Sequence, residues 1–423
     1  MNTVDRIKCL VMKNKKTILI IIGNLVAAFL LFSQGYSQDN SGYIYGRIKT
    51  IDGEYIGKIR WGDEETFWFD HFNAAKKGNK ALKELSDKYG NKKKNDWLDF
   101  DWSLESIWAD KIGLSHQYTS QFGDIRRIVV LDESTVRLEL KNGRELLLSG
   151  QGYNDIGTTI RIKDRELEDL SIRWNRIEEI EFLPTPKNLK VDHGKPIYGT
   201  VETFRKGTFT GFIQWDSDER LSNERLDGDA NDEDVSLAFS TIRSIKKEGN
   251  GSLVELVSGR EFYLINSNDV NEENRGIIVN DPAIGRIEIP WKYFQKLTLK
   301  DSPGTGLAYT KYPSPRGISG KVYTVGEKSF GGRLVYDIDE EWETEMLEGN
   351  DDDVEYIIPF RNIASIEPKN YAYSMIELKN GEKILMGGTR DVSDDNDGIL
   401  VYGSPDKEPT HLPWDKVVEI RFE

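Results

Sequence analysis

Oxygen-bearing side chains alternate along one short stretch in the middle of the chain, at Asp227, Asp229 and Asn231. An EF-hand loop begins in this way, because Ca²⁺ takes carboxylate and carbonyl oxygens as ligands. An EF-hand also needs Gly at its sixth position and Glu at its twelfth, where this chain has Asp232 and Ala238. The match ends halfway, so we expect an acidic hairpin tip without a metal and no cofactor, with calcium at these three residues as the alternative.

Pairs of carboxylates recur three times along the chain. Two such groups facing a cleft could hydrolyse a glycosidic bond. The pairs are Asp63/Glu64, Asp216/Glu219 and Asp337/Glu340. A catalytic pair is needed once, whereas residues that shape a turn recur wherever the turn recurs. We therefore expect no enzyme and no catalytic residues, with a carbohydrate-active envelope enzyme as the alternative.

Other catalytic signatures are missing from the sequence. The four histidines form no metal-binding pair, and the only cysteine, Cys9, lies near the start of the chain. There is no G-x-S-x-G elbow, no phosphate-binding glycine loop and no dinucleotide fingerprint. These absences favour a protein that binds rather than one that reacts.

A local concentration of tryptophan and lysine is the candidate binding surface. Residues 71–95 hold eight lysines against two acidic residues. Trp68, Trp97, Trp102 and Trp108 lie in or beside this stretch, and Lys92, Lys93 and Lys94 are consecutive. Tryptophan can stack on a sugar ring or anchor a protein contact, and lysines attract an anionic partner such as a polysaccharide. The alternative is that the tryptophans bury a helix over Asn79–Tyr89 against the rest of the fold.

Two kinds of β-hairpin must position these residues, and each occurs three times. The first surrounds a glycine and leads into an acidic turn, and it begins at Gly46, Gly199 and Gly320. The second carries Asn-Gly or Ser-Gly between alternating apolar residues, ending at Gly143, Gly259 and Gly381. Asn-Gly is typical of a tight hairpin turn in which both central residues have positive φ.

Each hairpin is followed by the same ending, an aromatic residue with apolar residues three and six positions later. The six instances are Phe122/Ile125/Ile128, Trp174/Ile177/Ile180, Phe239/Ile242/Ile245, Trp291/Phe294/Leu297, Phe360/Ile363/Ile366 and Trp414/Val417/Ile420. The ending predicts a short turn that buries the aromatic ring, then a closing strand with alternating burial.

These patterns predict an all-β fold of three tandem repeats, each a pair of small SH3-like or Sm-like barrels or β-sandwich units. The expected domains are repeat one at 38–183 with a partly helical insertion at 70–121, repeat two at 184–301 and repeat three at 302–423. Proline-containing linkers separate the repeats and should act as semi-rigid spacers.

The first 37 residues predict a signal peptide, with an uncleaved membrane anchor as the alternative. Lysines precede an apolar run from Thr17 to Phe32, and Gly35-Tyr36-Ser37 suits a signal peptidase. These residues carry a net charge of +4, so their removal takes the chain from −15 to −19. Such a charge argues against nucleic acid and anionic membranes as partners.

Together these observations predict an exported, non-catalytic binding or scaffold protein in the periplasm, at the cell envelope or outside the cell. Its partner would be a protein or a polysaccharide of that compartment. It would contact a membrane only through an uncleaved N-terminal segment. A calcium-stabilised adhesive module is a further alternative.

Overall fold

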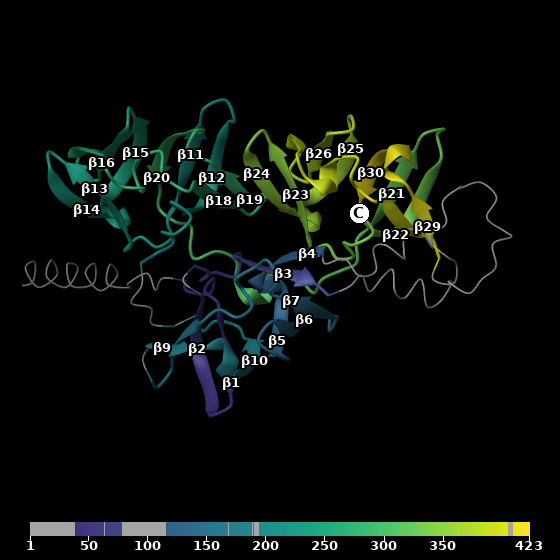
Figure 1. Cartoon of the computed structure of the whole chain (residues 1–423), viewed down its shortest axis with the longest axis horizontal. Coiled ribbons are helices and arrows are strands. Elements are labelled where there is room, and N and C mark those ends of the chain that lie inside the picture. Colours follow the sequence, from purple (N-terminus) through teal and green to yellow (C-terminus); the bar gives the residue numbers. More distant parts are fainter. Residues whose placement is uncertain are drawn as a thin grey trace, which may run out of the picture. The chain divides into compact units, whose positions relative to one another are not determined.

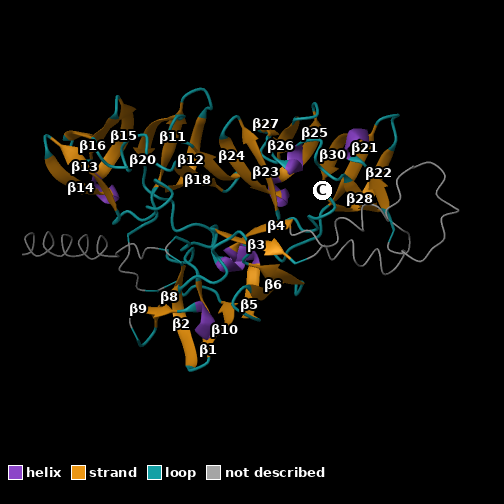
Figure 2. Ribbon diagram, in the orientation of Figure 1, coloured by secondary structure: helices purple, strands orange, loops and turns teal. Residues whose placement is uncertain are grey.

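The computed structural model describes residues 39–62, 64–77, 116–167, 169–187, 189, 194–404 and 409–423. The predicted signal peptide, the helix expected over 79–89 and Cys9 lie outside these ranges. Thirty strands cover most of the described chain, and every described helical element is a three-residue 3-10 turn (Figure 2). The all-β class is therefore confirmed. No helix in these ranges has the length and apolar character needed to cross a membrane.

The thirty described strands fall into three consecutive segments of ten strands each (Figure 1). Segment one (40–183) holds β1 (Tyr45–Thr50), β2 (Gly53–Trp61), β3 (His71–Lys76), β4 (His116–Gln121), β5 (Ile125–Val130), β6 (Thr135–Leu140), β7 (Glu145–Ser149), β8 (Ile160–Asp164), β9 (Asp169–Ile172) and β10 (Ile177–Phe182). Segment two (184–301) holds β11 (Tyr198–Thr203), β12 (Thr208–Gln214), β13 (Arg225–Ala230), β14 (Glu233–Ala238), β15 (Ile242–Glu248), β16 (Gly251–Leu256), β17 (Glu261–Leu264), β18 (Ile277–Asp281), β19 (Gly285–Ile289) and β20 (Phe294–Leu299).

Segment three (302–423) holds β21 (Ser319–Thr324), β22 (Ser329–Val335), β23 (Met346–Asp351), β24 (Val354–Pro359), β25 (Ile363–Pro368), β26 (Tyr373–Leu378), β27 (Lys383–Gly387), β28 (Ile399–Tyr402), β29 (Thr410–Leu412) and β30 (Val417–Phe422). The 3-10 turns are η1 (Phe122–Asp124), η2 (Trp174–Arg176), η3 (Phe239–Thr241), η4 (Tyr309–Lys311), η5 (Phe360–Asn362), η6 (Arg390–Val392) and η7 (Trp414–Lys416).

Strand order follows one pattern in the three segments. In segment one the sheet runs β4-β3-β7-β6-β5-β10-β1-β2-β8-β9, all antiparallel. Adding ten or twenty to each number gives the pairings of segments two and three, except that β13–β14 forms a separate hairpin joined to β17 by one bridge. None of the sheets that the described strands form closes on itself, so the closed form of the expected small barrel is not present there.

Paired glycines explain how three strands meet at the first hairpin of each segment. Gly46 lies opposite Gly57 across β1–β2, and Gly57 also pairs with β8. A Cβ added to Gly57 would lie 1.9 Å from the carbonyl oxygen of Lys163 on β8. Gly211 and Gly332 face the same close approach in segments two and three, at 2.4 and 2.2 Å. A side chain at any of these positions would push the third strand away.

The six aromatic residues of the repeated ending are buried, and each begins a turn before a strand. Five of the turns are 3-10, at η1, η2, η3, η5 and η7. At the sixth, Tyr293 N donates to Pro290 O at 2.9 Å and Phe294 N donates to Trp291 O at 3.2 Å. The rings are at most 6% exposed, and they pack on residues of the acidic turn such as Trp61, Trp215 and Tyr336.

The Asn-Gly and Ser-Gly turns differ in detail from the prediction. Only the glycines, Gly143, Gly259 and Gly381, have positive φ, while the preceding Asn or Ser does not. Gly143 N donates to Leu140 O at 2.9 Å, and Leu140 N donates to Arg144 O at 2.9 Å. This is a type I turn followed by a bulge at glycine, which also matches the twist of a hairpin.

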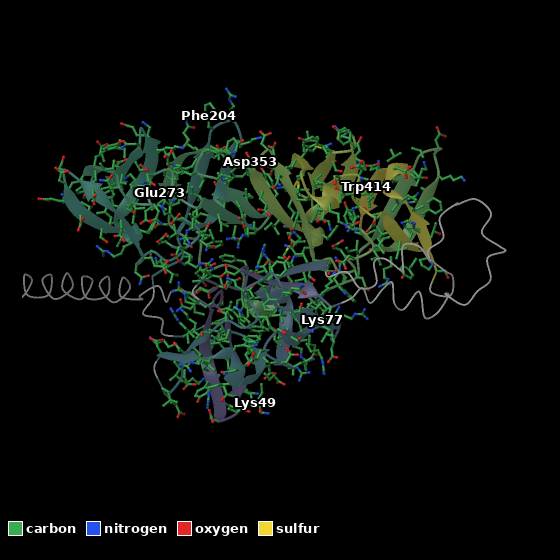
Figure 3. The ribbon with its side chains drawn as sticks, viewed as in Figure 1. Lys49, Lys77, Phe204, Glu273, Asp353 and Trp414 are labelled. Atoms are coloured by element: carbon green, nitrogen blue, oxygen red, sulfur yellow. The ribbon has the colours of Figure 1, made fainter. Side chains whose placement is uncertain are left out.

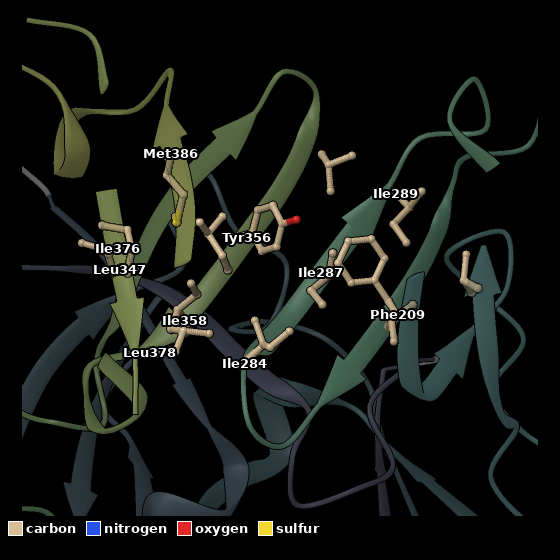
Figure 4. Close-up of a cluster of buried hydrophobic side chains, with 14 of the residues drawn as sticks. Phe209, Ile284, Ile287, Ile289, Leu347, Tyr356, Ile358, Ile376, Leu378 and Met386 are labelled. Atoms are coloured by element: carbon tan, nitrogen blue, oxygen red, sulfur yellow. The ribbon is translucent and has the colours of Figure 1, made fainter. Parts of the chain in front are cut away.

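Two large hydrophobic cores hold these strands. One is formed by segment one, and the other runs without a break through segments two and three. Strands β19 and β24 pair where segments two and three meet, with Ile287 opposite Tyr356. Figure 4 shows Phe209, Ile287 and Tyr356 together at this junction. Residues 40–423 accordingly form one compact unit.

Residues 302–315, expected to be a spacer, pack against segment one. Tyr309 and Tyr312 belong to its core. The Tyr309 ring lies 4.6 Å from that of Trp68, and its hydroxyl donates to Ile125 O at 2.9 Å.

One apolar side chain stays exposed at the tip of the first hairpin in each segment. Ile51, Phe204 and Val325 are 61%, 54% and 55% exposed. Phe204 points away from the ribbon (Figure 3). Single exposed apolar residues of this kind are ordinary on a folded protein.

Candidate functional site

The predicted carboxylate pairs lie in tight turns that follow β2, β12 and β22. In each turn an aromatic residue exchanges backbone hydrogen bonds with a glutamate four positions on. Trp215 N donates to Glu219 O at 2.7 Å, and Glu219 N donates back at 3.0 Å. Asp216 and Ser217 between them have φ of 50° and 57°, a left-handed conformation that Asp adopts more readily than most residues. Asp63, from the first pair, lies outside the described residues.

A second aspartate locks each of these turns. The residues are Asp155, Asp269 and Asp391. Trp215 Nε1 donates to the Asp269 carbonyl at 2.9 Å, and the Asp269 carboxylate accepts the backbone N–H of Asp227 at 2.7 Å. Asp155 and Asp391 make the same two contacts in segments one and three. The carboxylates of these three aspartates therefore already accept backbone N–H groups, which is a structural role.

The glutamates of the three turns are held in an environment that favours their protonated form. Burial, with Asp269 close by, raises the pKa of Glu219 to about 8. Burial also raises the pKa of Glu65 and Glu340 well above the usual range. A carboxyl that stays protonated near neutral pH can donate a hydrogen bond or release a proton when a cation arrives.

A cavity of about 430 Å³ lies between β4 of segment one and segment three. Its segment-one wall is formed by consecutive residues of β4, Gln117, Tyr118 and Thr119. Six carboxylates line the rest, together with Met346, Thr389 and Arg390: Asp337, Asp339, Glu340, Glu345, Glu348 and Asp391. We call this the acidic cavity.

Lys76, at the end of β3, pairs with two of the carboxylates that line the acidic cavity. Its Nζ lies 3.0 Å from Asp339 Oδ2 and 2.5 Å from Glu345 Oε1, and all three side chains are at least 89% buried. Burial alone would lower the pKa of Lys76, but Asp339, Glu345 and Glu340 outweigh it and hold that pKa well above its usual value. The ammonium therefore stays charged and ties segment one to segment three.

Arg390 supplies the other cation. Its Nε lies 2.6 Å from Asp337 Oδ2, and it also pairs with Asp397. Burial nevertheless raises the pKa of Asp337 to about 7. Glu348 Oε1 accepts from Gln117 Nε2 at 2.5 Å, and burial, with Glu355 and Glu288 close by, raises its pKa to about 7.

Among the described polar atoms at the acidic cavity, the Tyr118 hydroxyl and Glu340 Oε2 are buried without a hydrogen-bond partner. Tyr118 is only 1% exposed. A buried polar group without a partner costs about 1–3 kcal/mol, and a ligand or water that supplies the partner removes that cost. The cavity thus combines negative charge, space and unmet hydrogen-bonding capacity.

Of the predicted binding residues, only Trp68 lies in the described ranges, and it is fully buried. Its Nε1 lies 3.1 Å from both Ser41 O and Thr185 Oγ1, so the indole is a core residue and offers no surface for a partner. Residues 71–76 and 116–121, at the ends of the expected insertion, form the paired strands β3 and β4. Trp97, Trp102, Trp108 and Lys92–Lys94 lie outside the described residues.

The predicted calcium ligands lie on the β13–β14 hairpin. Asp227 and Asp229 are two apart on β13 and so share a face, and Asn231 follows in the turn with φ of 53°. Asp229 Oδ2 accepts from Asn266 Nδ2 at 3.1 Å. Among the described residues no group of three or more His, Cys, Asp or Glu side chains is arranged to hold a metal. Calcium binding here stays a prediction.

Sequence reasoning identified Asp337 and Glu340 but missed Lys76, Tyr118, Glu345 and Glu348. Lys76 and Asp339 are more than 260 positions apart in the sequence, so no local pattern could have predicted that they pair. The chain matches no protein-family model, no curated protein and no solved structure.

Proposed function

We propose that this protein is an exported, non-catalytic binding protein of the cell envelope or extracellular space, built from three tandem copies of one ten-stranded unit. Each copy would be a pair of small SH3-like or sandwich-like halves. The acidic cavity would hold a positively charged group, an amine or a guanidinium, of the partner. The observation that carries the proposal is the lining of that cavity, which among the described residues holds six carboxylates and one cation, Arg390, while Lys76 pairs with two of the carboxylates from outside the lining.

Tandem copies are supported by the strand order, which repeats at intervals of ten strands. They are also supported by side-chain contacts that recur at matching positions. Asp70, Glu224 and Glu345 each accept two backbone N–H groups from the turn before them. Copies held together in this way form a scaffold in which a site between two copies keeps its geometry.

A binding role is favoured over hydrolysis because the paired carboxylates recur in every segment and are engaged by the backbone. Glu219 and Asp269, with pKa values raised to about 8 and about 6, have the acid–base separation that a hydrolase uses. However, Asp269 already accepts a backbone N–H, and equivalent residues occupy the other two turns. Incubation with envelope polysaccharide is therefore expected to release no reducing ends.

Export is supported by the sequence of residues 1–37. Expression of the full chain in a bacterium should yield a mature protein that begins at Gln38 and fractionates outside the cytoplasm. Retention of the intact N-terminus in the membrane fraction would favour the anchor instead.

Calorimetric titration with putrescine and with arginine amide tests the acidic cavity. At about pH 8, where the carboxyls of Asp337 and Glu348 are mostly ionised, both probes should bind with a stoichiometry of one. Glu348→Gln should weaken binding about tenfold, equivalent to about 1.4 kcal/mol.

The matched control is Asp232→Asn, which removes one exposed carboxylate far along the chain from the cavity residues. It should leave the affinity unchanged. Equal weakening by both variants would mean that the probes respond only to net charge, and absence of binding would overturn the cavity assignment.

A further inference from the structure

A second charged surface, of opposite sign, lies on strands β2, β8 and β9 of segment one. The antiparallel register places Lys58 directly opposite Lys163, and Arg60 directly opposite Arg161. Residues two apart on a strand share a face, so all four cations lie on one side of the sheet. Ile59 and Ile162, which alternate with them, are buried on the other side. We call these four side chains the cationic face.

The positive charges of the cationic face repel one another. Like charges directly opposite each other on neighbouring strands destabilise a sheet by about 0.2–1 kcal/mol per pair. Here two such pairs are adjacent, in a chain whose net charge is −15. Among the described residues of β9, Asp169 lies opposite Lys163 and Ser171 lies opposite Arg161. Arg60 also reaches Glu224 at 3.4 Å.

Lys58 is the most unusual member of the cationic face. Lys58 is only 5% exposed, and its Nζ lies 4.5 Å from the centre of the Tyr43 ring. Within the described residues, no carboxylate lies at ion-pair distance from its ammonium. Burial, with Arg60 and Lys163 close by, lowers the pKa of Lys58 to about 7. A negative charge placed beside it would reverse that effect.

The same side chains line a cavity of about 250 Å³. Its described lining consists of the four cationic residues, Asp169, Ser171 and the two residues that alternate with them, Ile162 and Leu170. A water molecule takes about 30 Å³ of liquid volume, so the space admits a tetrahedral oxyanion and part of the molecule that carries it.

The other two segments show that the fold does not require these charges. Counting from the paired glycines, the positions of Lys58 and Lys163 hold Phe212 and Asn280 in segment two. Those of Arg60 and Arg161 hold Gln214 and Ile278. In segment three the corresponding pairs are Arg333/Tyr402 and Val335/Leu400. Only segment one places cation opposite cation.

We propose that the cationic face binds a phosphate or sulfate group, the tetrahedral oxyanion of a phosphorylated or sulfated partner. Arg60 and Arg161 bring planar guanidinium groups that can hold two oxygens each, and Lys58 and Lys163 add point charges. Ser171 can donate a further hydrogen bond, while Asp169 excludes ligands that carry negative charge toward β9. This site is independent of the amine-binding role proposed for the acidic cavity.

The test is calorimetric titration of the full chain with four probes: inorganic phosphate, inorganic sulfate, a sugar monophosphate and a sulfated oligosaccharide. Saturable binding of at least one inorganic anion, with chloride at equal ionic strength giving no heat, is the expected result. The two larger probes identify the source, because the natural partner's class should bind at least tenfold more tightly than the bare anion.

Arg161→Gln should weaken the binding of inorganic anion about tenfold, and this exposed residue can be replaced without disturbing the core. Lys58→Met should abolish binding, and Lys163→Gln provides a further variant if the buried substitution prevents folding. The matched control is Arg333→Gln, which removes the cation at the position of Lys58 in segment three and should change nothing.

A variant in which Lys92, Lys93 and Lys94 are all replaced by Gln separates this site from the lysine-rich stretch. If that variant loses anion binding while Arg161→Gln keeps it, the proposal is wrong. Equal weakening by Arg161→Gln and Arg333→Gln would overturn it as well, because the anion would then respond to net charge alone.

Discussion

Segments two and three are joined to each other in a different way from how segment one is joined to them. The first junction is apolar: Ile287 and Tyr356 pair across β19 and β24 inside one continuous core. Segment one keeps a separate core, which Tyr309 and Tyr312 complete, and it also meets segments two and three through buried ion pairs. Arg220 meets Asp70 at 2.5 Å, Lys76 meets Asp339 and Glu345, and Arg361 meets Asp124 at 2.7 Å.

The difference shows which junction can respond to pH or to a ligand. An apolar junction depends on packing and is indifferent to pH, whereas a buried ion pair depends on both charges being present. The acidic cavity lies along the charged junction, so a ligand there acts on the contact that holds segment one in place. Three measurements test whether the two junctions differ in this way.

Lys76→Met should have the largest effect, because it leaves Asp339 and Glu345 buried without their cation while keeping the apolar stem. Removal of one partner from a buried ion pair costs about 3–5 kcal/mol. The loss should appear as a lower midpoint of urea unfolding. Lys77→Met is the neighbouring control, since Lys77 is exposed and donates only to Thr135 Oγ1 at 2.8 Å. A similar loss in both variants would remove the special role of Lys76.

Ile287→Ala should destabilise the apolar junction by about 2–4 kcal/mol, because Ile287 is fully buried. Hydrogen-exchange protection should fall in both β19 and β24 and stay unchanged in β1–β10. Ile287→Val, which removes one methylene group, should cost about 0.5–1.5 kcal/mol. Equal loss of protection in segment one would show that all three segments unfold as one unit.

Glu219→Gln should remove part of the pH dependence of stability. The Glu219 pKa rises from 4.5 to about 8 on folding, so the folded chain keeps a proton that the unfolded chain releases. Stability should therefore fall as pH rises from about 4.5 to about 8, by at most about 1.4 kcal/mol per pH unit for one such group. Free energies of unfolding measured across this range should show a shallower slope in the variant. Asp232→Asn, which replaces an exposed carboxylate that is not among the groups acting on Glu219, is the control. An unchanged slope in Glu219→Gln would contradict the assignment.

Local patterns in the sequence predicted the features that depend on neighbouring residues. The aromatic endings, such as Phe360 before Ile363, form turns and strands because ring burial and alternation are properties of a few consecutive positions. The glycine turns were predicted in the right places but with the wrong geometry. An Asn-Gly pair fits two turn types, and the bulge is chosen by the register of the flanking strands.

Contacts between segments could not be predicted in this way. Trp68 was assigned to a surface, yet Tyr309 from a linker 241 positions later covers its ring. The acidic cavity escaped for the same reason, because Tyr118 and Glu348 meet only after the whole chain has folded. The cationic face was open to prediction in principle, since Lys58-x-Arg60 and Arg161-x-Lys163 alternate within strands, but its register was not.

The burial of Tyr309 and Tyr312 in segment one sets an order for biogenesis. A growing or translocating chain cannot complete its first core until residue 312 has emerged, by which time all of segment two is available to fold. The core of the N-terminal third of the polypeptide therefore stays incomplete until Tyr309 and Tyr312, which follow the middle third, are available. A chaperone that assists folding would therefore remain longest on segment one.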